Sequence, residues 1–274
     1  MPELSPEEQE RYARQIGPGV LSPEGQLCLK RSTALIARAG GMGGPAAMVL
    51  VMAGVGRVII AHGGRLSSPD LNRQVLGSEE ALGQPRAESF AQRLRSLNRF
   101  VTVDSVDHEP DDEEALALAR RADVILSCAP GFAERMRLNR AAVTAGVPLV
   151  DAAQWGMSGS LVVVRPRQTA CLRCLYPQQP DFEELFPVVG GISSALGSLA
   201  GLEAIKILAR TGEPLYGRLW TIDAYHGRTS ILNLRRDPRC PCCGSENPQG
   251  GDCPSFRLGE NGTVPFDAQG GPQS

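Results

Sequence analysis

The feature that most constrains this chain is a strand–loop–helix–strand unit near its N-terminus. Residues 33–37 (TALIA) have the pattern of a short apolar strand, and the glycine-rich loop Gly40-Gly41-Met42-Gly43-Gly44 comes soon after it. Residues 45–55 then have the composition of a helix, and 57–62 (RVIIAH) that of a second strand. About 30 residues in this order are typical of the unit from which parallel sheets with crossover helices are built. The sequence therefore predicts an α/β fold.

The same alternation continues toward the C-terminus. Further helices are expected at 85–98, 111–122, 134–146 and 191–210, and further strands at 101–106, 123–127 and 148–153. We expect antiparallel strands at 158–166 and 219–224. Together these elements predict a mostly parallel sheet with an antiparallel C-terminal extension. A helical arm over 1–32 precedes this domain (33–244), and the Gly-, Pro-, Gln- and Ser-rich residues 245–274 are expected to be a disordered tail.

Composition argues against several classes of function. The 274 residues include 28 basic and 30 acidic side chains, a formal net charge of -2, so no long-range field favours nucleic acid or an anionic membrane. We expect no membrane span, since we see no apolar run of the ~18 residues that one needs. The acidic, polar N-terminus has no secretory signal, so we expect a cytoplasmic protein. In such a protein the 8 cysteines are expected to be metal ligands or buried thiols before disulfides.

Four of the cysteines form two C-x-x-C knuckles. Cys171 and Cys174 make the first, and Cys240 and Cys243 make the second. Four thiolates predict a closed, tetrahedral zinc site, which is structural because no ligand position is left for water. Cys242 can replace Cys243 as a ligand, but only Cys243 preserves the spacing. A set of buried or redox-active thiols is the alternative interpretation.

The glycine-rich loop departs from a nucleotide-binding loop at its first position. In the pattern G-x-G-x-x-G, the glycines allow a tight turn and let backbone N–H groups approach a phosphate at the helix N-terminus. Gly40 and Gly43 occupy the second and third positions with Gly41 between them, but Arg38 replaces the first glycine. An acid that holds the ribose hydroxyls is expected ~20 residues further on, and His62 is found there. A neutral imidazole cannot chelate both hydroxyls as a carboxylate does.

A series of short stretches occurs between residues 10 and 244 in a specific order. They are RYARQ (11–15), the GGMGG loop, MAGVG (52–56), LNRQVLG (71–77), GQPRAES (83–89), RLRSLN (93–98), CLRC (171–174), LGSLAGLEAIKIL (196–208) and the CPCC knuckle. In this order the chain resembles the ThiF/MoeB/HesA proteins, bacterial relatives of the ubiquitin-activating enzymes. The resemblance implies a Rossmann-like domain, a structural zinc and a homodimer. It also implies a reaction in which ATP adenylates the C-terminal Gly-Gly carboxylate of a ubiquitin-like sulfur carrier and releases pyrophosphate.

The resemblance assigns roles to individual basic and polar residues. The arginine of the family's N-terminal arm matches Arg14. The family's phosphate-binding arginine and glutamine match Arg73 and Gln74, and its active-site lysine falls on Arg86. The change to Arg86 keeps the positive charge but not the compact ammonium group, so phosphate stabilisation is retained in altered form.

The same correspondence leaves three acids of the family site missing. The ribose-binding aspartate falls on His62, the second acid of that motif on Gly64, and the Mg²⁺-binding aspartate on Pro130. Even one lost electrostatic donor costs ~10²–10³ in rate, so we expect catalysis to suffer. From the replacement of a glycine and two aspartates by Arg38, His62 and Pro130, we expect weak or absent ATP binding, and Mg²⁺ binding is in doubt with it. Asp151, at the end of strand 148–153, is a candidate substitute carboxylate; a solvated strand-end acid is the alternative. The crossover segment 180–191 lacks the relay cysteine that the family often carries.

The residues support three hypotheses about function. The favoured one is a non-catalytic or regulatory relative that keeps the fold, the zinc and the binding surface for a sulfur carrier. The second is an active adenylyltransferase of the molybdopterin, thiamine or cysteine pathway, rewired around Arg14, Arg73, Arg86 and Asp151. The third is an enzyme of another class in which Arg38 and His62 hold a different anionic ligand.

Overall fold

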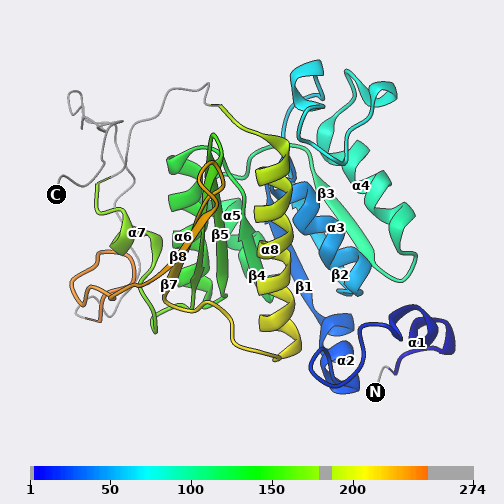
Figure 1. Ribbon diagram of the computed structural model, residues 1–274, viewed down its shortest axis with the longest axis horizontal. Coiled ribbons are helices and arrows are strands. Elements are labelled where there is room, and N and C mark those ends of the chain that lie inside the picture. The colour runs from blue at the N-terminus through cyan, green and yellow to red at the C-terminus, as the bar shows by residue number, and fades with distance from the viewer. Residues whose placement is uncertain (1–2, 179–186, 246–274) are drawn as a thin grey trace.

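An eight-stranded sheet of order β3-β2-β1-β4-β5-β6-β7-β8 organises the chain in the computed structural model, which describes residues 3–178 and 187–245 (Figure 1). The strands β3, β2, β1, β4 and β5 are parallel, and β6, β7 and β8 continue the sheet in antiparallel pairing. The strands are β1 Thr33–Ala37, β2 Arg57–Ala61, β3 Thr102–Val106, β4 Val124–Ser127, β5 Leu149–Trp155, β6 Ser158–Val164, β7 Arg218–Asp223 and β8 Arg228–Asn233.

Helices cover both faces of the parallel part of the sheet. One apolar core lies under α3, α4 and α8, and a second lies under α5 and α6 and includes the cysteine knuckles (Figure 1). The helices are α1 Pro6–Tyr12, α2 Pro23–Arg31, α3 Gly43–Ala53, α4 Arg86–Leu97, α5 Asp112–Ala119, α6 Phe132–Ala145, α7 Leu172–Leu175 and α8 Gly190–Ala209, with short 3₁₀ helices at Ser68–Asp70 and Glu79–Ala81. The central strands β1, β2 and β4 are almost wholly apolar, as expected of parallel strands buried on both sides, whereas the edge strand β3 is only partly buried.

The expected α/β architecture is confirmed, including the antiparallel C-terminal extension. The helices and strands expected from the sequence are all present, with ends that differ by a few residues. The one-turn helix α7 and the edge strand β8 were not predicted. β8 is exposed along its whole length, so it lacks the buried apolar run that marks β1, β2 and β4. Residues 246–274 of the tail expected to be disordered, and 179–186 of the crossover segment, lie outside the described residues.

Helix α8 is long and apolar enough to cross a membrane by length and composition, with a mean hydropathy of 1.4 over an 18-residue window. The expectation that no run reaches this length was therefore wrong, because the many Gly, Ala and Ser residues of α8 do not lower its hydropathy enough. In the structure 56% of that window is buried, and α8 packs on α3, α2, β5 and β6. These contacts are those of a helix inside a protein core.

Glycines allow α8 to approach α3 closely. A Cβ atom at Gly197 would lie 2.0 Å from the backbone oxygen of Met42, and one at Gly201 would lie 3.0 Å from a side-chain carbon of Val49. Met42 immediately precedes α3 and belongs to the glycine-rich loop. The packing of α8 therefore fixes the position of that loop.

This contact predicts a large difference between two alanine substitutions in the same helix. Gly197→Ala must displace the Met42 backbone, so we expect it to lower the free energy of unfolding by about 1–3 kcal/mol or more. Gly191→Ala is the matched control, since no atom lies within 4 Å of its added Cβ. Urea unfolding followed by circular dichroism measures both, and equal stabilities for the two variants would contradict the close approach.

Candidate functional site: the crevice at the carboxyl ends of the parallel strands

The glycine-rich loop lies against three residues of the predicted site. A Cβ at Gly40 would lie 3.3 Å from His62 Cε1 and 3.6 Å from the Gln74 amide, and a Cβ at Gly41 would lie 3.3 Å from Arg73 Cγ. Gly43, the first residue of α3, passes so close to Arg38 that an added Cβ would be 2.2 Å from the Arg38 carbonyl oxygen. Close approach thus requires a glycine at Gly43 and makes Gly40 and Gly41 tightly packed, and the structure brings the loop, His62, Arg73 and Gln74 together.

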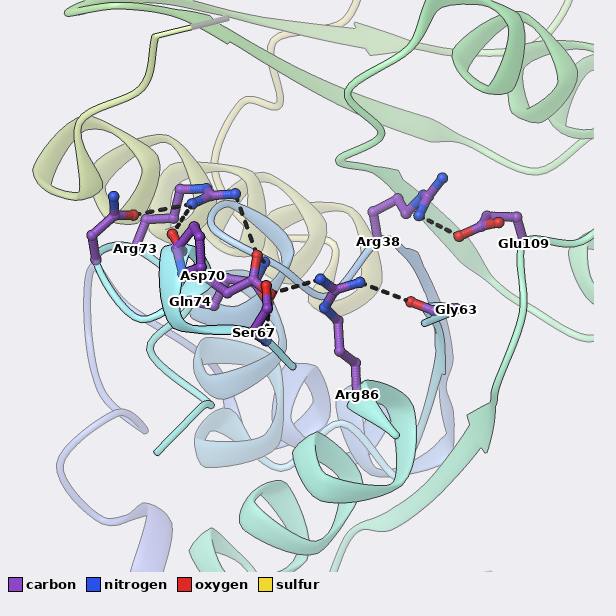
Figure 2. Close-up of polar contacts among 10 residues, drawn as sticks. Arg38, Gly63, Ser67, Asp70, Arg73, Gln74, Arg86 and Glu109 are labelled. Carbon is purple, nitrogen blue, oxygen red and sulfur yellow. Dashed lines mark hydrogen bonds and ion pairs between the residues drawn. The ribbon is translucent and has the colours of Figure 1, made fainter. Parts of the chain in front are cut away.

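Asp70 joins the basic residues of the site into one network (Figure 2). Its Oδ2 accepts from Arg86 Nη2 at 2.6 Å, and its Oδ1 accepts from Gln74 Nε2 at 2.7 Å and lies 3.5 Å from Arg73 Nη2. The backbone N–H and hydroxyl of Ser67 also donate to Oδ2, at 3.0 and 2.9 Å. Burial raises the pKa of Asp70, but the hydrogen bonds from Arg86 and Ser67 outweigh it and hold the pKa below its ordinary value. Asp70 is therefore ionised and neutralises part of the positive charge.

His62, directly after β2, is a buried, neutral side chain. It is 5% exposed, its ring lies 5.7 Å from that of Phe90, and its Nδ1 has no hydrogen-bond partner among the described residues. Burial lowers the pKa of His62 to about 3, and the positive charges of Arg38 and Arg86 add to this effect. The imidazole is uncharged at neutral pH and offers a single ring acceptor where a carboxylate would offer two oxygens.

Asp151, the proposed substitute carboxylate, is held by a buried arginine. Arg135 of α6 donates to both of its oxygens, from Nε at 3.1 Å and from Nη2 at 2.5 Å, and the Ser127 hydroxyl donates to Oδ1 at 2.8 Å. Asp151 is 1% exposed, so the alternative of a solvated strand-end acid was wrong. A metal would have to displace Arg135 before this carboxylate could bind it.

Arg14 lies at the other end of the domain. It is exposed and falls in the turn after α1. Its neighbours Arg11 and Gln15 donate to Leu97 O and Ala53 O, at the C-terminal ends of α4 and α3. The crevice lies at the opposite, N-terminal end of α3, so one chain does not bring Arg14 to Arg73 and Arg86.

The four knuckle cysteines lie together on the side of the sheet that α5 and α6 cover. The Sγ atoms of Cys171, Cys174, Cys240 and Cys243 all lie within 4.8 Å of one another. Four thiolates at the usual 2.3 Å from a tetrahedral zinc have sulfur–sulfur separations of about 3.8 Å. The Sγ atoms of Cys171 and Cys240 are 3.8 Å apart, and those of Cys174 and Cys243 are 3.5 Å apart. The cluster can therefore hold a metal ion with little movement.

Asn139 of α6 connects the two knuckles. This side chain is 1% exposed, accepts from the Leu172 N–H at 3.0 Å and donates to Cys242 Sγ at 3.2 Å. Cys242 is thus engaged by an amide beside the cluster, which supports Cys243 as the fourth ligand.

Residues 12–242 match the ThiF family. The chain belongs to the ThiF family. Protein HesA of Leptolyngbya boryana is 40% identical over 249 residues, which cover 90% of each chain. The sulfur carrier protein adenylyltransferase of Thermus thermophilus is 37% identical over 253 residues (89% of this chain, 93% of the relative), and the sulfur carrier protein ThiS adenylyltransferase of Escherichia coli is 35% identical over 241 (86% and 96%). The resemblance seen in the sequence is confirmed.

The fold is also that of a solved structure. Escherichia coli MccB in complex with MccA-N7isoASN has a TM-score of 0.77 over 86% of this chain and 74% of that chain. The two sequences are 22% identical, so the likeness concerns the fold alone.

Several residues of this ThiF-family site were not predicted from the sequence. They are Asp70, Glu109, Glu134, Arg135 and Asn139. Asp70 had a signal, because its spacing of three and four residues from Arg73 and Gln74 favours contact. The others are brought in from distant segments, and nothing in their local sequence distinguishes them from solvated charges.

The neutral His62 predicts a specific pH dependence of stability. The folded state disfavours protonation, while unfolded His62 binds a proton below its ordinary pKa of 6.5. Stability is therefore fully present above pH 6.5 and falls toward pH 3, by about 2 kcal/mol between pH 7 and pH 5. In His62→Gln we expect this loss to shrink by about that amount relative to wild type. Urea unfolding at a series of pH values tests this, and identical slopes for wild type and His62→Gln would contradict it.

The cysteine cluster predicts different metal contents for two neighbouring substitutions. Cys243→Ser removes a ligand, so we expect the purified variant to retain much less metal and to unfold more easily. Cys242→Ser leaves the four-cysteine cluster intact and should keep about one metal ion per chain. Elemental analysis of both proteins makes the comparison, and a reversed pattern would assign Cys242 as the ligand.

Proposed function

We propose that this ThiF-family chain binds a ubiquitin-like sulfur carrier through its C-terminal Gly-Gly segment and has lost most or all ATP-dependent adenylation. The observation that carries the proposal is the loss of the family's carboxylates from three specific positions of the crevice. His62, Gly64 and Pro130 stand where the resemblance places the ribose and Mg²⁺ acids. The nearby carboxylates of Asp70 and Asp151 are each held by arginines. The residues present do not fit a Mg²⁺–nucleotide, so we derive no adenylation step for this chain.

The proposed partner comes from the relatives. Two of them are named as adenylyltransferases of sulfur carrier proteins, and the shared length covers nearly all of each chain. We propose that 33–244 forms the binding domain, with the arm 1–32 as an accessory to it. A homodimer fits the position of Arg14, which can approach a crevice only if that crevice belongs to a second copy.

We propose zinc as the metal of the cysteine cluster. Four thiolates with near-tetrahedral spacing suit Zn²⁺, and a site with four protein ligands is structural. Its residues lie in the second apolar core, away from the glycine-rich loop. The metal would fasten the C-terminal knuckle to the 171–174 segment and supply folding energy rather than chemistry.

An active adenylyltransferase is the second candidate. The relatives' names favour it, as does the retained cluster of Arg73, Gln74 and Arg86 around Asp70. Cationic clamps supply much of the catalysis of phosphoryl-type transfers. This candidate requires carboxylates from a second chain or the release of Asp151 from Arg135.

Two assays with one carrier separate the candidates. With a ThiS-type carrier, we expect calorimetric binding that disappears when the two terminal glycines are deleted. We expect ATP–pyrophosphate exchange at least about 10²–10³-fold slower than that of the Escherichia coli ThiS adenylyltransferase measured in parallel. Exchange that requires the carrier tail and is lost in Arg73→Ala would establish the active enzyme instead. Absence of carrier binding would contradict the proposed partner.

A further inference from the structure

Arg38 adopts a backbone conformation that residues with side chains rarely adopt. It comes directly after β1, at the position of the first glycine of the loop pattern, with φ of 66°. This left-handed region favours glycine because a Cβ atom crowds the backbone there. The side chain must therefore make contacts that hold the residue in this conformation.

Two carboxylates from distant segments supply those contacts. Arg38 Nε donates to Glu134 Oε2 at 2.8 Å, and its Nη1 forms a short ion pair with Glu109 Oε1 (Figure 2 shows the second contact). Glu134 lies in the first turn of α6, after β4, and Glu109 lies after β3. The Arg38 and Glu134 side chains are 23% and 11% exposed, so this pair is largely shielded from solvent.

These ion pairs lie where ligands bind in folds of this kind. In a doubly wound sheet, the ligand crevice is outside the carboxyl ends of the strands, at the point where the strand order reverses. Here the order β3-β2-β1-β4 places that point between β1 and β4. The Arg38–Glu134 pair joins the loop after β1 to the helix after β4 and so lies across it. Glu109 also lies against Gly63, where an added Cβ would be 2.8 Å from Glu109 Oε1, so the ion pairs cover this residue as well.

We propose that Arg38, Glu109 and Glu134 form an autoinhibitory latch that occupies the crevice and excludes nucleotides. The inference rests on the proposed function and deepens it. The missing acids account for the loss of turnover, and the latch accounts separately for weak binding. A phosphate entering the crevice meets two carboxylates that repel it and an arginine that is already neutralised.

The latch is tested by opening it in full-length protein. Arg38→Gly combined with Glu109→Gln and Glu134→Gln removes the arginine side chain from the crevice together with both negative charges. The matched control is Arg210→Gly with Glu24→Gln and Glu213→Gln. It makes the same charge changes at exposed positions outside the crevice, and Arg210 is also a non-glycine residue with positive φ (54°). Calorimetric titration with ADP in a buffer without added Mg²⁺ and without chelator reports binding without turnover and leaves any metal of the cysteine cluster in place.

We expect the triple latch variant to bind ADP about tenfold or more tightly than wild type and the control, as when a competent state rises from about a tenth to most of the population. If that variant does not fold, Glu109→Gln with Glu134→Gln is used, since it keeps the Arg38 backbone and frees its guanidinium; it should also bind ADP more tightly. A folded latch variant with unchanged ADP affinity would overturn the latch.

The exchange assay on the same variants separates this inference from the proposed function. Tighter ADP binding with exchange still at background supports both. Tighter binding together with carrier-dependent exchange keeps the latch and overturns the loss of catalysis. Unchanged binding with background exchange overturns the latch and leaves the proposed function standing.

Discussion

The parallel pairing of β1 with β2 on one side and β4 on the other is the constraint on which the crevice depends. Its register aligns Ala37 with Ala61 and with Ser127. The residues directly after these three therefore emerge at one edge of the sheet, although they lie far apart in the sequence. Arg38 and His62 meet there for this reason, and the segments that carry Glu109 and Glu134 begin at the same edge. The chemistry of the crevice is thus set by the residues at the carboxyl end of each strand.

Burial then decides how those residues pair. A cation removed from water is stable only with a carboxylate and further hydrogen bonds around it. Asp70 meets this need for Arg86, and Asp151 meets it for Arg135. Each carboxylate that stabilises an arginine in this way is withdrawn from any metal or ribose. Under the proposed function, the ion pairs that stabilise these buried arginines therefore also make the crevice a poor Mg²⁺ site.

The sequence predicted the fold and the family because both depend on local pattern and order. The amino-acid sequence alone shows the strand and helix runs, the loop glycines and the cysteine spacing. Strand β8 was not predicted, because this exposed edge strand lacks a buried apolar run. It also identified the departures Arg38, His62 and Pro130, since each occupies a position with an expected residue type. The partners of these residues could not be predicted. Glu109 and Glu134 look like solvated charges until the sheet brings them to Arg38.

Helix α6 connects the crevice with the cysteine cluster, two sites that look unrelated in the sequence. Arg135 and Asn139 are one helical turn apart and so lie on the same face. Arg135 holds Asp151 and packs over the rings of Phe132 and Tyr176, while Asn139 holds the two cysteine knuckles together. Glu134, next to Arg135, carries one half of the ion pair across the crevice. Because the cysteine cluster fastens the segments against which α6 packs, it also restricts the helix that positions Glu134. A metal ion bound by the cysteine cluster would therefore contribute to the rigidity of the crevice without taking part in its chemistry.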